Sequence, residues 1–127
     1  MSSKTKIRGI WVRPLYHPLR MEIEDSLSSL QKLVDGYIEV IYPFDDPVAI
    51  ICNEEAKLRD DLLPNRALYD ENGKIYDIIF GDFFICLARP DSENFESLSD
   101  DLIKKYIDYY KKPEIFMIAN GEIKVIK

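Results

Sequence analysis

The chain has 127 residues, of which 46% are hydrophobic, so it can bury the core of one domain without disulfides or metals. Its 23 acidic and 17 basic residues give a net charge of −6, which disfavours direct binding to nucleic acid. The first residues lack the apolar stretch of a signal peptide, and no run approaches the roughly 18 apolar residues of a membrane span. We therefore expect an acidic, cytoplasmic protein that does not enter a membrane.

The N-terminal part of the chain predicts two strands and a helix. β-branched and aromatic residues predict a first strand over 7–12, which Pro14 ends, and a short second strand over 20–23. Leucine and valine side chains at helical spacing then predict a helix. Asp25 is placed to cap its N-terminus, and Gly36 stands where a left-handed C-cap is needed.

The middle of the chain is rich in predicted strands. Residues 37–42 form one, and the wholly apolar run 48–52 predicts a strand in the interior of a sheet. The polar residues 53–65 then predict an irregular excursion with one helical turn. Residues 67–69 are predicted to be extended, and an Asn-Gly turn signal follows them. Residues 75–88 are again strand-like, but a Gly-Asp pair within them predicts a bulge or a turn between two strands.

The C-terminal part predicts a helix followed by a hairpin. Ser97 or Ser99 is placed to cap the helix, and Pro113 ends it. Strand-like residues over 115–119 and 122–126 flank a second Asn-Gly pair, the strongest hairpin signal in the chain. The element order predicts a single α+β domain with a largely antiparallel sheet, two main helices and a C-terminal hairpin.

The motifs of common enzyme and metal sites are missing from the sequence. His17 is the only histidine, and Cys52 and Cys86 lie in separate apolar runs, so a four-ligand zinc set is not plausible. We expect both cysteines to be buried, reduced thiols. The glycines form no phosphate-binding loop, and no G-x-S-x-G motif is present. The sequence therefore predicts no cofactor and no catalytic residue.

One polar segment between apolar strands is the best candidate for a binding site, because loops at strand ends commonly carry function. Its amides and arginines could bind a carboxylate, a phosphate or a base edge. The candidate residues, including one aspartate after a later strand, are Asn53, Glu54, Glu55, Arg59, Asn65, Arg66 and Asp82. A structural interpretation stays open: the amides cap turns, Arg66 pairs with Glu54 or Glu55, and Asp82 satisfies a bulge.

Four short strings of the chain, at residues 34–39, 53–55, 65–68 and 79–85, carry a family resemblance. In this order they resemble an uncharacterised domain family, domain of unknown function three-eight-four-six, met in phage, plasmid and conjugative-element proteins. The resemblance covers about residues 7–88 and leaves the helix and hairpin of 89–127 as an extension. It implies no enzymatic activity; it implies an accessory protein of a mobile element that counters host defence.

The favoured hypothesis is a non-enzymatic binding protein of a phage or mobile element that antagonises a host protein or defence system. Its contacts would be the acidic surface and the segment 53–66. This choice depends on the resemblance, the net charge and the missing catalytic set.

Two alternatives remain open from the sequence. The first is a small-molecule protein that binds or sequesters a nucleotide, with Arg59, Arg66 or Arg89 at phosphates and Trp11, Tyr37 or Tyr69 stacked on the base. The second is an enzyme that uses Glu54, Glu55 and Asp82 beside Arg66, with Mg²⁺ held by carboxylate oxygens.

Overall fold

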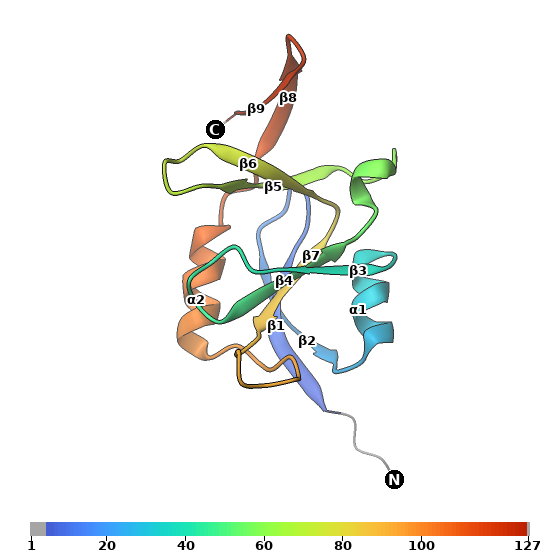
Figure 1. Ribbon diagram of the computed structural model, residues 1–127, viewed down its shortest axis with the longest axis vertical. Helices are drawn as coiled ribbons and strands as arrows, with labels where there is room; N and C mark the ends of the chain where they lie inside the picture. Colours follow the sequence, from blue (N-terminus) through green and yellow to red (C-terminus); the bar gives the residue numbers. More distant parts are fainter. Residues whose placement is uncertain (1–4, 127) are drawn as a thin grey trace.

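The computed structural model describes residues 5–126, which form an α+β fold around a five-stranded antiparallel sheet (Figure 1). The strands of this sheet are β1 (Lys6–Val12), β2 (Leu19–Glu24), β3 (Ile38–Ile41), β4 (Val48–Asn53) and β7 (Phe83–Leu87). They lie in the order β2-β1-β7-β4-β3, and every neighbouring pair is antiparallel. The predicted fold class is confirmed.

The remaining elements cover this sheet or extend from it. They are α1 (Leu27–Val34), the 3₁₀ turn η1 (Ala56–Leu58), β5 (Pro64–Tyr69), β6 (Ile75–Phe80), α2 (Asp100–Tyr109), β8 (Ile115–Ala119) and β9 (Glu122–Ile126). Strands β5 and β6 form a two-stranded ribbon, and β8 and β9 form the predicted hairpin. Within residues 5–126 no helix is long and apolar enough to span a bilayer.

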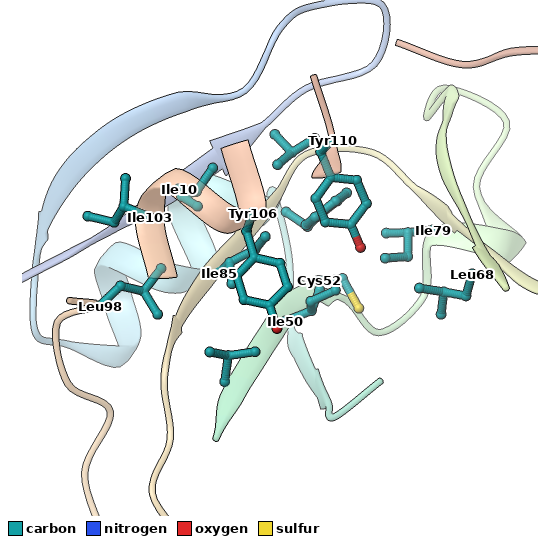
Figure 2. Close-up of a cluster of buried hydrophobic side chains, with 13 residues drawn as sticks. Ile10, Ile50, Cys52, Leu68, Ile79, Ile85, Leu98, Ile103, Tyr106 and Tyr110 are labelled. Atoms are coloured by element: carbon teal, nitrogen blue, oxygen red, sulfur yellow. The ribbon is translucent and has the colours of Figure 1, made fainter. Parts of the chain in front are cut away.

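Apolar side chains are buried on both faces of the sheet. Every residue of β4 is buried, with Ala49 and Ile51 on the side of α1 and Ile50 and Cys52 on the side of α2. This alternation follows from the two-residue repeat of a strand, and burial on both faces explains why the run is wholly apolar. Figure 2 shows the cluster on the α2 side, which also contains Tyr106.

Strand β1 crosses close to β7, and Gly9 makes this possible. A Cβ atom at Gly9 would lie 2.2 Å from the carbonyl oxygen of Ile85 and 2.5 Å from the Phe84 ring. No side chain fits at that separation, so only glycine allows the two strands to pack as they do.

Helix α1 begins and ends one residue away from the predicted caps. Ser26, not Asp25, is the N-cap, and its hydroxyl accepts from the Ser29 backbone N–H at 3.1 Å. The backbone N–H of Asp25 instead donates to the carbonyl oxygen of Thr5, so Asp25 continues the pairing of the preceding strand and does not start the helix. At the other end, the left-handed residue is Asp35, with φ 62° and ψ 48°. An aspartate can adopt this conformation at modest cost, and the left-handed cap is Asp35, one residue before the predicted Gly36, whose own φ is 156°.

The Gly-Asp pair within 75–88 is a turn between two strands that belong to different sheets. Gly81 has φ 80°, and its N–H donates to the Leu63 carbonyl at 2.8 Å. The chain thereby leaves the β5–β6 ribbon and enters the centre of the main sheet as β7.

The C-terminal elements follow their predicted bounds closely. Ser99 is the N-cap of α2 and accepts from the Leu102 N–H, whereas Ser97 accepts from the backbone N–H of Arg8 in β1. Both residues of the β8–β9 turn have positive φ, 54° at Asn120 and 78° at Gly121, as a type I′ turn requires. In Figure 1 the hairpin extends away from the sheet, beyond β5 and β6.

Candidate functional site

Asn53 has a structural position at the end of α1. It is 5% exposed, and its amide nitrogen donates to the carbonyl oxygens of Val34 and Asp35 at 3.0 and 3.1 Å. Its amide oxygen accepts from the Glu55 backbone N–H at 2.7 Å. Asn53 therefore satisfies carbonyl groups that the helix end leaves unpaired, and it also shapes the turn into η1.

Arg59 holds the same corner through two carboxylates. Its guanidinium donates to the backbone oxygen and the carboxylate of Asp35 at 2.6 and 2.8 Å, and to both carboxylate oxygens of Asp61. The bonds to Asp61 and then Asp35 raise the pKa of Arg59 above its ordinary value. Because its N–H groups are engaged in this way, Arg59 is a tether between the loop and α1.

Asn65 and Arg66 form a buried network near the C-terminal end of α2. The amide nitrogen of Asn65 donates to Val12 at 3.0 Å and to Gly81 at 2.8 Å, and its amide oxygen accepts from Arg66 Nη1 at 2.9 Å. Arg66 Nη2 donates at 2.9 Å to the carbonyl oxygens of residues 16 and 110. These bonds join β1, β5, the β6–β7 turn and the end of α2.

Arg66 is 1% exposed and carries one unused donor. Its Nε has no hydrogen-bond partner, and its bonded partners are carbonyl and amide oxygens, not carboxylates. The pairing with Glu54 or Glu55 considered from the sequence is not present among the described residues, because the Nη groups of Arg66 donate to Asn65, Tyr16 and Tyr110 instead. Burial lowers the pKa of Arg66, and the negative charge of Glu114 opposes this effect.

Asp82 bonds to an indole and not to the other candidate acids. It accepts from Trp11 Nε1 at 3.0 Å, and burial raises the pKa of its carboxyl group. Among the residues the structure describes, no hydrogen bond or ion pair links Asp82 to Glu54 or Glu55. In the same part of the chain, no three His, Cys, Asp or Glu side chains are grouped so that they could hold a metal.

The arginines named for a phosphate site have separate partners. Arg59 binds acids beside α1, Arg89 binds Glu96 through two bonds of 2.8 and 3.0 Å, and Arg66 is buried beside the end of α2. They do not converge on one point. Of the aromatic residues named for base stacking, Tyr69 shares a cleft with Arg66.

This cleft, here called the hairpin cleft, lies between β5, the end of α2 and the base of the β8–β9 hairpin, and has a volume of about 600 Å³. Its apolar wall contains Tyr69, Tyr109, Ile115 and Ile126, and its charged residues are Arg66, Lys112 and Glu114. Glu114 is fixed in place, because one carboxylate oxygen accepts from the Ala67 N–H at 2.8 Å and the other accepts from the Tyr69 hydroxyl. Burial and the bond to Glu114 raise the pKa of Tyr69.

Sequence reasoning found only Arg66 and Tyr69 among the cleft residues. Glu114 was missed because it meets β5 only through the fold, more than forty positions along the chain, and Tyr109 was missed because only the fold brings it to the same cleft. The one available signal is the position of Glu114, an acid between Pro113 and an apolar strand.

The β8–β9 hairpin exposes an unusual amount of apolar surface. Ile118 is 77% exposed, and Ile115, Met117, Ile123 and Ile126 are between 42% and 54% exposed. The register places Ile118 opposite Ile123 on one face. Both strands pair only with each other, so each also presents an open edge.

Comparison with known proteins gives a family and nothing more specific. The family model described as Domain of unknown function (DUF3846) matches residues 7–111. The match includes α2 and ends before the hairpin. No curated protein and no solved structure matches the chain.

Proposed function

The chain belongs to the DUF3846 family of domains of unknown function, and from that premise we propose that it is a non-enzymatic accessory protein of a phage or other mobile element. In this proposal it binds a host protein and thereby antagonises a host function or defence system. The mobile-element setting comes from the family resemblance. The binding role is supported by one observation, the exposed apolar surface of the β8–β9 hairpin.

An isolated two-stranded hairpin is only marginally stable in water, and a large contiguous patch of exposed apolar side chains usually marks a contact surface. Here Phe116, Ile118, Ile123 and Val125 share one face of the hairpin. A partner that covers this face would bury aliphatic surface and could also pair with an open strand edge. In the segment 53–66, by contrast, the candidate residues Asn53, Arg59, Asn65 and Arg66 are engaged in bonds that hold the fold, so the proposal places the contact on the hairpin.

The position of the hairpin strengthens this assignment. It lies outside residues 7–111, which match the family, so it adds a surface to the shared domain. Its side chains are exposed without being required by the central core. A chain can acquire or change such a surface without altering the domain that carries it.

The test is capture of a host protein by immobilised full-length chain, followed by measurement of the affinity with the purified partner. Ile118→Lys should weaken binding by about 30-fold or more, as expected for a central apolar contact. Leu58→Lys is the matched control, because Leu58 is 85% exposed on η1, away from the hairpin. Capture of the same partner with equal affinity by the Ile118 variant would contradict the proposal, and so would the absence of any specific partner.

The two alternatives have less support from the geometry. A nucleotide site would need converging arginines, and Arg59 and Arg89 are bound to acids elsewhere. A carboxylate enzyme would need Glu54, Glu55 and Asp82 to act on one point, and Asp82 is bound to Trp11.

A further inference from the structure

The hairpin cleft combines an apolar wall with a buried positive charge. Tyr69 and Tyr109 present aromatic rings, and Ile115 and Ile126 of the hairpin supply aliphatic surface. A volume of about 600 Å³ is within the usual range for small-molecule sites. Such sites are typically apolar with a few fixed polar groups that orient the ligand.

Arg66 is the charged group in this cleft that lacks full compensation, and the buried hydroxyl of Tyr110 in the same lining also has no hydrogen-bond partner among the described residues. A buried guanidinium is costly unless its charge and all its donors are satisfied. Here the side chain is 1% exposed, no carboxylate hydrogen-bonds to it, and its Nε–H is unpaired. An anionic oxygen brought to this guanidinium would supply both the missing acceptor and the missing negative charge.

The negative charge of Glu114 compensates Arg66 only in part, and Glu114 makes no hydrogen bond to it. Both of its carboxylate oxygens already accept hydrogen bonds, one from Ala67 and one from Tyr69, and these bonds hold it in the cleft wall. Lys112 adds a second positive charge to the lining. The charges of Arg66 and Lys112 therefore exceed that of Glu114, and the cleft favours an anion.

We propose that the hairpin cleft binds a small organic acid whose carboxylate pairs with Arg66 and whose aromatic body lies against Tyr69, Tyr109 and the two isoleucines. A carboxylate fits better than a phosphate, because the Arg66 guanidinium has one unused N–H and a phosphate has three oxygens to satisfy. This site does not depend on the proposed host partner, since it lies at the base of the hairpin and not at its tip.

The experiment is calorimetric titration of the full-length protein with benzoate, phenylacetate and indole-3-acetate, each compared with its neutral amide and with adenosine monophosphate. At least one acid should bind, and its amide should bind about tenfold more weakly or worse. Failure of all three acids, equal binding of acid and amide, or binding of the nucleotide alone would overturn the proposal.

Substitutions in and beside the hairpin cleft then test whether the acid binds there. Ile115→Trp should fill the cleft and abolish binding, whereas Met117→Trp, on the same strand but outside the lining, should leave the affinity unchanged. Both positions are about half exposed, so neither change should disturb the fold.

Arg66→Met should also abolish binding, but Arg66 holds the core network and this variant could fail to fold. Lys112→Ala, with Lys111→Ala as its control, therefore tests the charge requirement, with weaker binding expected only for Lys112→Ala.

Discussion

Asn65 shows how one buried amide can join parts of the chain that are distant in sequence. Its nitrogen bonds to the last residue of β1 and to the turn after β6, and its oxygen bonds to Arg66. Because Asn65 is 0% exposed, water cannot replace any of these partners.

We expect Asn65→Ala to lower the free energy of unfolding by about 2–4 kcal/mol, since it removes the amide's bonds to two carbonyl groups and the shorter of the two bonds that Arg66 Nη1 makes to residue 65. The check is urea unfolding followed by circular dichroism. Asn72→Ala, at an exposed position in the β5–β6 turn, should change stability by less than about 0.5 kcal/mol. Equal effects of the two substitutions would show that the network is not needed for stability.

The sequence located several of these polar residues and left their roles open between binding and capping of turns. Asn53, Asn65 and Arg66 were noticed because each lies beside an apolar strand. Their bonding partners, such as Val34 for Asn53 and Tyr110 for Arg66, become neighbours only when the sheet and helices assemble. A pattern of residue types therefore identifies a polar side chain, whereas its partner depends on the fold.

At the scale of elements, two serines in the segment before α2 have different roles, one at the start of the helix and one at the edge of β1. Ser99 accepts from the first turn of the helix, while Ser97 accepts from the Arg8 N–H at 2.9 Å. Strand β1 pairs with β7 only over Ile10–Val12, so this serine and the Leu98 N–H supply bonds to the rest of that strand edge.

We expect Ser99→Ala to destabilise the protein by about 1 kcal/mol, the usual cost of losing an N-cap. Ser97→Ala should cost about 1–3 kcal/mol, because it leaves the Arg8 N–H unpaired in a partly buried strand. Hydrogen exchange of individual amides separates the two effects: Ser99→Ala should expose the first turn of α2, and Ser97→Ala should expose β1. Faster exchange at the same amides in both variants would contradict this division of roles.

Element types were predictable, and some boundaries were not. The hairpin was predicted at its observed bounds because Asn120 and Gly121 suit a type I′ turn. The N-cap of α1 was missed by one residue because Asp25 and Ser26 are both good caps, and the choice depends on a bond from Asp25 to Thr5. Gly81 was recognised as a break, but nothing local shows that the strands on its two sides enter different sheets.

At the scale of the whole molecule, the core contains cysteine thiols and tyrosine hydroxyls that lose their protons more readily once the chain unfolds. Burial, together with nearby negative charge, raises the pKa of both Cys52 and Cys86 to about 12, from 9.0. Burial likewise raises the pKa of Tyr106 and Tyr110. Above pH 9 the unfolded chain loses protons that the folded chain keeps, so the stability that these groups contribute is constant below pH 9 and falls between pH 9 and about 12.

Urea midpoints measured from pH 7 to pH 11 should show this decline. In a variant with Cys52→Ala and Cys86→Ala the decline should be shallower, because only the tyrosines would then contribute. A midpoint that does not change up to pH 11 in the native sequence would rule out the thiols and phenols as buried, neutral groups.

The strand order has a consequence for the way the molecule folds. Strands β1 and β2 form one local hairpin and β3 and β4 form another, but β7 lies between them in the sheet. The two hairpins can join only when Phe83–Leu87 inserts, and its partners in β1 are more than seventy positions earlier in the chain. Closing so long a loop is slow relative to forming a hairpin. During synthesis, both hairpins will emerge early with unpaired edges, and the central sheet will be completed only after the last of its strands has left the ribosome.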